Sequence, residues 1–217
     1  PMWKELRRIN KKRAAIVLFG SEPFSSFLRT SAIDLFKYDW IWNKGRATGF
    51  VHAKNKPLKA HEIISVFSKG TTVHANQSAD RMNFYPQMRT DRPYLKKIRS
   101  INTGKLNHVP SRANVEFLGT INKNDGVRYP VSVIDYTLHN VGLDHPTQKP
   151  VALMSYLIRT YTEEGDTVLD FTMGSGTTGV ACVKLNRNFI GYELREDYFA
   201  IAQRRIAEAQ LQMTLPL

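Results

Sequence analysis

The spacing of apolar residues in the first part of the chain predicts a helix, a strand and a second helix. Residues 2–9 repeat apolar side chains at helical spacing, with Lys and Arg on the other face. A continuous apolar run over residues 14–19 ends at Gly20, and such a run is typical of a strand buried on both faces of a parallel sheet. Ser21 and Pro23 follow, and they predict the cap and the first turn of the next helix.

The pattern changes in the middle of the chain. Short apolar runs at residues 38–42, 62–67 and 131–134 predict three further strands. Between residues 71 and 130 the apolar periodicity fades, and Asn, Gln, Arg, Lys and Tyr dominate. We interpret residues 71–130 as an inserted module with little core of its own. A disordered linker is the alternative, and the aromatic residues within the stretch count against it.

Residues 166–193 combine two apolar runs with a Gly-rich turn. The first run predicts a short strand that ends at Asp170, and three glycines follow before an apolar helical run. A second predicted strand, residues 189–192, ends on Glu193. A strand, a Gly-rich turn, a helix and a strand that ends in an acid form the unit that binds a nucleotide-like ligand at the carboxyl edge of a parallel sheet.

Two ligands compete for that unit. The glycines from Gly174 onward spell the G-x-G-x-x-G dinucleotide pattern, but in a dinucleotide fold the first Gly follows the strand almost directly. Here four residues from Asp170 onward intervene, and an acid at the strand end repels a pyrophosphate but suits an ammonium group. Asp170 and Glu193 together therefore favour S-adenosylmethionine over NAD. A turn without any ligand is disfavoured, because each Gly costs roughly 0.5–1 kcal/mol of chain entropy.

Composition and charge narrow the class of partner. The chain has 217 residues, of which 42% are hydrophobic, so it is long enough to build a core. Lys and Arg number 31 against 19 acids, a formal charge of +12, which favours a polyanionic partner and argues against an ordinary small-metabolite enzyme. Nucleic acid is the expected polyanion.

The single cysteine, Cys182, excludes a disulfide within the chain and a Cys-rich zinc site, and it fits a reducing cytoplasm. We interpret Cys182 as a small buried apolar residue. No metal site is predicted. No apolar run reaches the roughly 18 residues of a membrane span, and no signal segment is recognised, so neither a membrane span nor secretion is indicated.

Two basic regions are candidates for nucleic-acid contact. Loop 43–60 carries several cations with Trp42 and Phe50 close by, which suits a groove for a phosphate backbone and an unstacked base; a merely mobile, soluble loop is the alternative. Residues 81–130 hold ten cations against three acids, interleaved with Asn, Gln and Tyr that read base edges. The candidate residues are Lys44, Arg46, Lys54, Arg89, Arg92, Lys96, Lys97 and Arg99.

The order of the elements predicts a circularly permuted α/β fold. A cofactor unit of this kind usually has its remaining strands downstream, but only one helix, predicted over residues 195–210, follows it here. The other strands must therefore come from upstream in the chain. We expect a Rossmann-like sheet in permuted order, with the basic module as an insertion.

Several segments together resemble one family. HPTQKP, a helix, VLDFTMGSGTTG and then FIGYEL are similar to the permuted, beta-type DNA amino-methyltransferases, which modify adenine N6 or cytosine N4. FGSEPF, YDWIWNK and HEIISVFSKG resemble the next three sheet segments of that family. The resemblance covers most of the chain outside residues 71–130, and residues 71–130 correspond to the family's target-recognition region.

The resemblance implies where S-adenosylmethionine binds. In the family the Gly-rich segment wraps the methionine part, the acid after the second strand holds the ribose, and the HPTxKP segment adds further contacts. Phe171 and Thr172 stand where the common D-P-F-x-G-S-G pattern has Pro and Phe, so no residue is assigned to the stack on the cofactor adenine. The implied cofactor residues are Asp170, Phe171, Thr172, Gly174, Ser175, Gly176, Thr177, Glu193, His145, Thr147 and Lys149.

One expected motif is absent from the printed sequence. The family catalyses with a D/N/S-P-P-Y/F/W tetrapeptide at a strand end, which accepts hydrogen bonds from the target amino group and stacks on a flipped base. Residues 1–217 contain no such tetrapeptide, so no catalytic residue is assigned in this chain. In this fold the catalytic strand lies between the strand ending at Asp170 and the strand over 14–19. We therefore expect two strands and the motif upstream of Pro1.

The resulting interpretation divides the chain into three parts. Residues 1–70 supply the strands and helices of the catalytic half, and residues 71–130 form the target-recognition insert. Residues 131–217 form the half that binds S-adenosylmethionine. The expected function is site-specific DNA methylation at an exocyclic amino group, with adenine N6 favoured over cytosine N4. A catalytically incomplete fragment that binds cofactor and DNA is one alternative, and an NAD-dependent oxidoreductase is another.

The resemblance also implies the partners and the cellular setting. The expected partner is double-stranded DNA with a flipped target base, and no membrane is involved. The expected location is the cytoplasm, for a bacterial, archaeal or phage-encoded protein. A second copy of the chain and a cognate restriction endonuclease are further partners that the resemblance allows.

Overall fold

The computed structural model describes residues 2–73, 79–98, 120–137 and 148–214. The chain divides into a main unit, Pro1–Tyr85 with Val131–Leu217, and an insert unit, Pro86–Pro130. The insert therefore begins later than the expected position 71. The reason is that the residues before Pro86 pack within the main unit: Met82 is buried, and the Tyr85 N–H donates to the Thr160 carbonyl at 2.8 Å.

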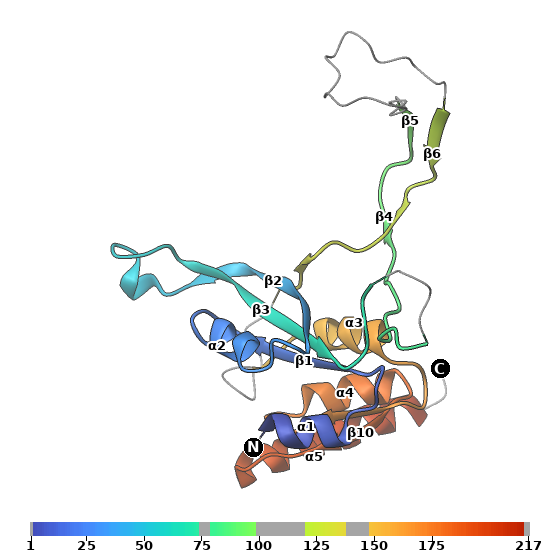
Figure 1. Ribbon diagram of the computed structural model, residues 1–217. Helices are drawn as coiled ribbons and strands as arrows, with labels where there is room; N and C mark the ends of the chain where they lie inside the picture. Colours follow the sequence, from blue (N-terminus) through green and yellow to red (C-terminus); the bar gives the residue numbers. More distant parts are fainter. Residues whose placement is uncertain (1, 74–78, 99–119, 138–147, 215–217) are drawn as a thin grey trace. The chain divides into compact units, whose positions relative to one another are not determined.

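The larger sheet of the main unit has four strands in the order β1 (Ala15–Gly20), β3 (Lys59–Ser68), β2 (Phe36–Thr48) and β8 (Val133–Asp135) (Figure 1). Strand β3 runs antiparallel to both of its neighbours, whereas β2 and β8 are parallel. The strands expected at 14–19, 38–42, 62–67 and 131–134 are confirmed, with β2 and β3 longer than expected.

The environment expected for β1 is wrong in two respects. Its one sheet partner in the described part of the chain is the antiparallel strand β3, and of its residues only Ile16 is buried. A continuous apolar run does not distinguish parallel from antiparallel pairing, and the other edge of β1 borders a cavity. Half-buried apolar side chains on β1 follow from that open edge.

One face of this sheet is covered by helix α3 (Val151–Tyr161). Its buried cluster includes Trp40 and Trp42 from β2 and Ile64 from β3, with Leu153 and Leu157 supplied by the helix. The Tyr161 hydroxyl accepts a hydrogen bond from the Trp40 indole at 2.7 Å and lies 3.1 Å from the Tyr38 hydroxyl. The Trp40 indole N–H and the Tyr161 hydroxyl thereby keep a partner, which the low dielectric of the core requires.

The opposite face is covered by helices α1 (Met2–Ile9) and α2 (Phe24–Thr30). Leu6 of α1 and Leu28 of α2 pack in one cluster with Phe67, which alternates on β3 with the residues of the other face. The amphipathic helix expected over 2–9 is therefore confirmed, and the sheet lies between two helical layers.

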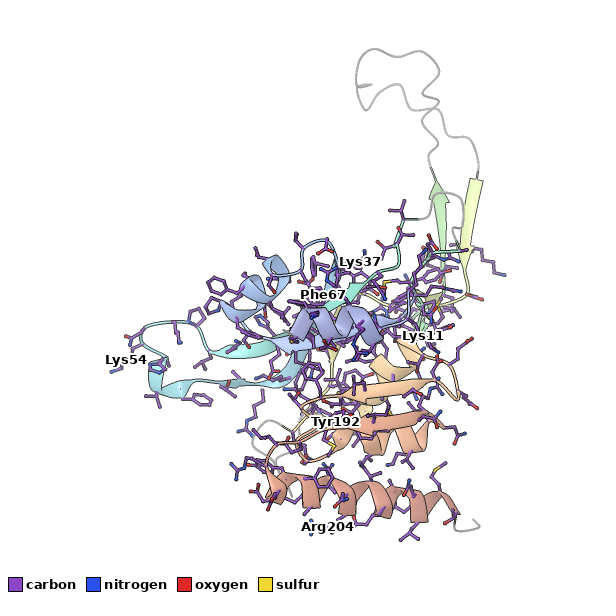
Figure 2. The ribbon with its side chains drawn as sticks, turned by 60° about the horizontal axis from the view of Figure 1, so that its bottom comes forward. Lys11, Lys37, Lys54, Phe67, Tyr192 and Arg204 are labelled. Carbon is purple, nitrogen blue, oxygen red and sulfur yellow. The ribbon has the colours of Figure 1, made fainter. Side chains whose placement is uncertain are left out.

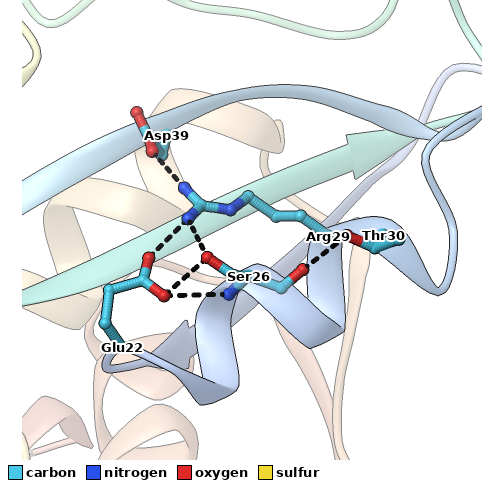
Figure 3. A network of polar contacts seen from close by, with 5 residues as sticks. All are labelled: Glu22, Ser26, Arg29, Thr30 and Asp39. Carbon is cyan, nitrogen blue, oxygen red and sulfur yellow. Dashed lines mark hydrogen bonds and ion pairs between the residues drawn. The ribbon is translucent and has the colours of Figure 1, made fainter.

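A polar network fixes helix α2 against β2 (Figure 3). The Arg29 guanidinium donates to Asp39 at 2.8 Å and to Glu22 at 2.5 Å, and Glu22 also accepts from the Ser26 hydroxyl and N–H. These contacts, the Ser26 hydroxyl first, lower the pKa of the Glu22 carboxyl. The expected capping by Ser21 is wrong: Pro23 occupies the cap position without a side-chain bond, and Glu22 satisfies the first-turn N–H instead.

The Gly-rich unit forms a second, two-stranded parallel sheet from β9 (Thr167–Asp170) and β10 (Asn188–Gly191). Helix α4 (Thr177–Lys184) connects the two strands and lies between α3 and the last helix, α5 (Glu196–Thr214) (Figure 1). The expected strand, turn, helix and strand are confirmed. Cys182 of α4 is buried in a cluster with Ile158 of α3, and burial raises the pKa of its thiol to about 12.

The insert unit is a two-stranded ribbon. Strand β4 (Arg89–Thr90) pairs antiparallel with β7 (Val127–Arg128), and β5 (Tyr94–Ile98) pairs antiparallel with β6 (Thr120–Asn124). Its described residues contain no helix and contribute none of the buried apolar clusters, in line with the polar sequence. Across the described ranges of the whole chain, no helix has the length and apolar character needed to cross a membrane.

Candidate functional site

Strands β1 and β9 border the same cavity but belong to separate sheets. Within the described residues, no backbone pairing joins them. The cavity has a volume of about 1760 Å³ and is lined by residues 14–19 on one side and by residues 166–175 on the other. The edge of each strand that would carry the next strand of a continuous sheet therefore faces open space.

Asp170 shapes the turn that follows β9. One carboxylate oxygen accepts the Thr178 hydroxyl at 2.5 Å, and the other accepts the Thr172 N–H at 3.1 Å. Gly174 and Gly176 both have positive φ, +51° and +76°, a backbone conformation that residues with a Cβ rarely adopt. The carboxylate thus bridges the beginning of the turn and the first turn of α4.

Glu193, two residues after β10, closes the other side of the turn. Its carboxylate accepts the Gly174 N–H at 2.9 Å and the Arg195 N–H at 3.0 Å. Parallel strands β9 and β10 pair Asp170 with Gly191, so both acids lie at the same end of this sheet. Two carboxylates therefore bracket one Gly-rich turn, although Glu193 itself is not part of the cavity lining.

Arg205 of α5 hydrogen-bonds to the middle of the turn. Its guanidinium donates to the Ser175 carbonyl at 2.6 Å, to the Ser175 hydroxyl at 2.8 Å and to the Thr177 hydroxyl at 3.3 Å. The Ser175 hydroxyl in turn donates to Gln148 at 2.9 Å. The sequence interpretation missed Arg205. The sequence around Arg205 carries no signal of this role, because its partner Ser175 lies 30 residues earlier in the chain.

Lys149 links the segment before α3 to the larger sheet. Its ammonium lies 2.9 Å from Glu62 on β3, and 5.1 Å and 5.4 Å from the ring centroids of Phe19 and Trp42. Lys44 approaches the other oxygen of Glu62 at 3.5 Å. Both lysines are mostly buried, so this carboxylate neutralises two cations that the sequence interpretation assigned to ligands.

The remaining expected cofactor residues divide into three groups. Phe171, Thr172, Gly174, Ser175 and Thr177 line the cavity together with Asp170 and Lys149. Gly176 packs against Ala202, where an added Cβ would lie 2.8 Å from the Ala202 Cβ. His145 and Thr147 lie outside the described residues.

The expected nucleic-acid residues lie on two hairpins. Arg46 and Lys54 are exposed on the β2–β3 hairpin, and Arg89 and Arg92 are exposed in the insert unit. Lys96 and Lys97 lie on β5 with side chains that are not described, and Arg99 falls outside the described residues. Trp42, expected beside the basic loop, is 1% exposed and donates its indole N–H to the Tyr136 carbonyl, so it is a core residue and not a base-stacking surface.

The charge around the Gly-rich turn is distinctive. Asp170 and Glu193 are acidic, while two neighbouring cations, Lys149 and Arg205, are engaged by Glu62 and by turn atoms. Such a site favours a ligand with a positive group and with donors, not a pyrophosphate. In the described part of the chain, no group of three or more His, Cys, Asp or Glu side chains is arranged to hold a metal ion.

These features define an α/β protein with a ligand site at the carboxyl end of a parallel strand pair, and comparison with known proteins gives its family. A family model described as DNA methylase, of the N6/N4 methyltransferase type, matches residues 1–204. The chain therefore belongs to the DNA methylase family.

Two curated relatives illustrate the extent of the similarity. The type II methyltransferase M2.DpnII of Streptococcus pneumoniae is 48% identical over 62 residues, which are 29% of this chain and 23% of that protein. The type II methyltransferase M.HpaI of Haemophilus parainfluenzae is 45% identical over 204 residues, 94% of this chain and 56% of that protein. The chain thus spans only part of the length of these relatives.

A solved structure supports the fold. The crystal structure of the M1.HpyAVI–SAM complex matches with a TM-score of 0.58 at 22% identity, over 93% of this chain and 78% of that one. At this identity the likeness concerns the fold, and it confirms the expected α/β class. The permuted order and the role of the insert stay predictions.

Arg205 gives the first test of this site. Arg205→Met removes the charged donor from Ser175 and Thr177, and we expect the free energy of unfolding to fall by about 1.5–3 kcal/mol, the scale of hydrogen bonds from charged groups. The measurement is urea denaturation followed by circular dichroism.

The matched control is the neighbouring Arg204→Met. Arg204 is labelled on α5 in Figure 2, is exposed, and pairs only loosely with Glu208 at 3.8 Å. Removing it should change stability by about 0.5 kcal/mol or less. Equal effects of the two substitutions would contradict the anchoring role of Arg205.

Proposed function

We propose that this chain binds S-adenosylmethionine and DNA and forms part of a site-specific DNA methyltransferase that modifies an exocyclic amino group. The observation that carries the proposal is the pair of carboxylates, Asp170 and Glu193, on either side of the Gly-rich turn in a chain of the DNA methylase family. Adenine N6 is the proposed acceptor, and cytosine N4 is the alternative.

The side chains of the turn fit this cofactor better than NAD. S-adenosylmethionine carries an ammonium, a sulfonium and a ribose diol, and it supplies an activated methyl group when bound. Asp170 lines the cavity and would attract the ammonium, and Glu193 would accept hydrogen bonds from the ribose. A dinucleotide would bring its pyrophosphate toward the same two carboxylates, where like charges repel.

In this proposal the side chains of Ser175, Thr177 and Lys149 position the site and do not contact the cofactor. Ser175 and Thr177 engage Arg205 and Gln148 through their hydroxyls, so their contribution to a ligand would come from the backbone. Lys149 would act indirectly, because its ammonium is held by Glu62. The segment before α3 would thus be fixed beside the cofactor by an ion pair to the larger sheet.

The gap between β1 and β9 supports the expected catalytic strand. Among the described residues, β1 and β9 each have one edge without a strand partner, and both strands line the cavity. The unpaired backbone groups of such an edge can hydrogen-bond to a further strand. We propose that a strand from outside the printed sequence pairs with both edges. Its D/N/S-P-P-Y/F/W tetrapeptide would then end beside Asp170, aim the lone pair of the target amino nitrogen and stack on the flipped base.

Two hairpins are the proposed DNA contacts. Arg46 and Lys54 on the β2–β3 hairpin are exposed and can reach phosphates, whereas Lys44 is paired with Glu62. In the insert unit, Arg92 is exposed, and Lys96 and Lys97 follow on the same ribbon. We assign target recognition to the insert unit, because base edges are read by interleaved polar and cationic side chains.

Methyl transfer tests the proposal directly. Tritium from labelled S-adenosylmethionine should enter unmethylated duplex DNA when the chain carries its upstream strands, and digestion to nucleosides should yield N6-methyladenine. N4-methylcytosine would select the alternative acceptor. Cofactor and DNA binding without label, even in the extended protein, would support a binding-only protein, and binding of NAD with unlabelled DNA would exclude the proposal.

The cofactor role of Glu193 has its own test. Glu193→Ala removes the proposed ribose acceptor, and we expect the affinity for S-adenosylmethionine to weaken by about 1.5–3 kcal/mol, the scale of charge-assisted hydrogen bonds. Isothermal titration calorimetry measures the change. Glu196→Ala, an exposed acid in the first turn of α5, is the control and should leave affinity unchanged. Equal affinities of wild type and Glu193→Ala would remove Glu193 from the site.

The insert unit is tested by the salt dependence of DNA binding. Neutralising Arg92, Lys96 and Lys97 with Gln should reduce affinity and lower the slope of log K against log salt by up to about 0.9 for each phosphate that the variant no longer neutralises. Fluorescence anisotropy at several salt concentrations gives the slope. The control replaces Lys4, Arg8 and Lys11, three exposed cations in and just after α1, with Gln. If both triple variants keep the wild-type slope, the insert cations are ordinary solvated residues.

A further inference from the structure

The β2–β3 hairpin extends beyond the sheet that supports it. Strand β1 pairs with β3 only as far as Ile63, and β8 pairs with β2 only over Ile41–Asn43. Past that point the two hairpin strands continue alone to the pair Thr48 and Lys59. We call residues 44–61 the arm; it projects from the sheet in Figure 1, and Figure 2 labels Lys54 at its far end.

The base of the arm is tied to the sheet. The Asn43 amide donates to Asp135 at 2.7 Å, and its oxygen accepts the Gly45 N–H at 3.2 Å. Gly45 has φ +66°, and a Cβ there would lie 2.8 Å from the Thr137 hydroxyl oxygen. These close contacts set the direction in which the arm leaves the sheet. A defined direction is needed if the tip is to contact another molecule at a fixed position.

The tip of the arm exposes two adjacent apolar side chains. A 3₁₀ turn, Phe50–His52, follows Gly49, whose φ is +94°. Phe50 is 68% exposed and Val51 is 93% exposed. A single exposed apolar residue is common on protein surfaces, but a contiguous pair at the end of a projecting hairpin indicates a contact site.

Cations surround that apolar tip. Residues 44–61 contain five Lys and Arg and no acid. Lys44 is paired with Glu62, and the exposed cations nearest the tip are Arg46, Lys54 and Lys56. The arm therefore presents two apolar side chains flanked by positive charges. A binding partner that matches this surface is a polyanion with an apolar interior.

We propose that Phe50 and Val51 form a wedge that enters duplex DNA between neighbouring base pairs, while Arg46, Lys54 and Lys56 contact the flanking phosphates. The proposal rests on the proposed function, which makes DNA the polyanion. An anionic membrane surface has similar chemistry, but two apolar residues bury too little area for a stable interfacial anchor. Wedge side chains of this type unstack a base step, which costs a few kcal/mol, and the bent duplex then contacts more protein.

The test compares a fully paired duplex with one of the same sequence that contains a single mismatched pair, where stacking is already weakened. Wild type should bind the mismatched duplex about tenfold more tightly, because the unstacking cost is smaller there. The variant Phe50→Ala with Val51→Ala should bind both duplexes equally and keep the wild-type salt slope. Fluorescence anisotropy with the full chain measures both quantities.

Two control variants distinguish the effect of the apolar wedge on DNA binding from effects of charge and of exposed apolar residues in general. Leu211→Ala changes a similarly exposed apolar residue, 65% exposed on α5, and should retain the mismatch preference. Lys54→Gln with Lys56→Gln should reduce the salt slope while retaining the preference. Because Phe50 and Val51 are exposed, their replacement should leave the melting temperature unchanged.

The outcomes distinguish this inference from the proposed function. A mismatch preference that survives in the tip variant would arise from base flipping elsewhere and would overturn the wedge proposal. The absence of a mismatch preference in wild type would overturn it as well. If the tip variant keeps DNA binding but no longer binds phosphatidylserine vesicles, the tip is a membrane contact. If it keeps DNA binding but its sedimentation changes, the tip contacts a second copy of the chain. Failure of wild type to bind any duplex would overturn the proposed function as well.

Discussion

Helix α3 is the element on which the rest of the main unit depends, because it packs on both sheets at once. Leu153 and Leu157 enter the core of the larger sheet, while Ile158 packs against α4 of the Gly-rich unit. In the described residues the two sheets share no backbone pairing, so their relation rests on this helix and on side-chain contacts. Trp40 donates to the buried Tyr161 hydroxyl of α3, which adds a directional constraint to the apolar contact.

This packing explains why the ligand site is built as it is. With β9 and β10 fixed on α4, their carboxyl ends bring Asp170 and Glu193 to the two sides of one turn. In the described part of the chain β9 pairs with β10 alone, and Arg205 of α5 supports the turn that follows β9 through the Ser175 carbonyl. The partly buried guanidinium of Arg205 also offsets part of the repulsion between the two carboxylates.

The sequence predicted the Gly-rich unit well, because its signals are local: an apolar run, an acid, glycines and a helical repeat lie in consecutive positions. It failed where the outcome depends on distant partners. Nothing near Lys44 reveals that Glu62 will neutralise it, and nothing near Arg205 reveals Ser175. The arm was expected as a loop, since cross-strand pairing of polar residues leaves no apolar alternation to recognise.

Glu62 connects these parts physically. It lies on β3 one residue after the arm ends, and it holds Lys149 from the segment that leads into α3. The ion pair is mostly buried and flanked by the rings of Phe19 and Trp42, so removing either partner would leave an uncompensated charge in a poorly hydrated place. Glu62 thereby joins the base of the arm to the segment that leads into α3 and lines the cavity. In the proposed complex, a DNA molecule held by the arm would be placed relative to the Gly-rich turn through β3, Glu62 and Lys149.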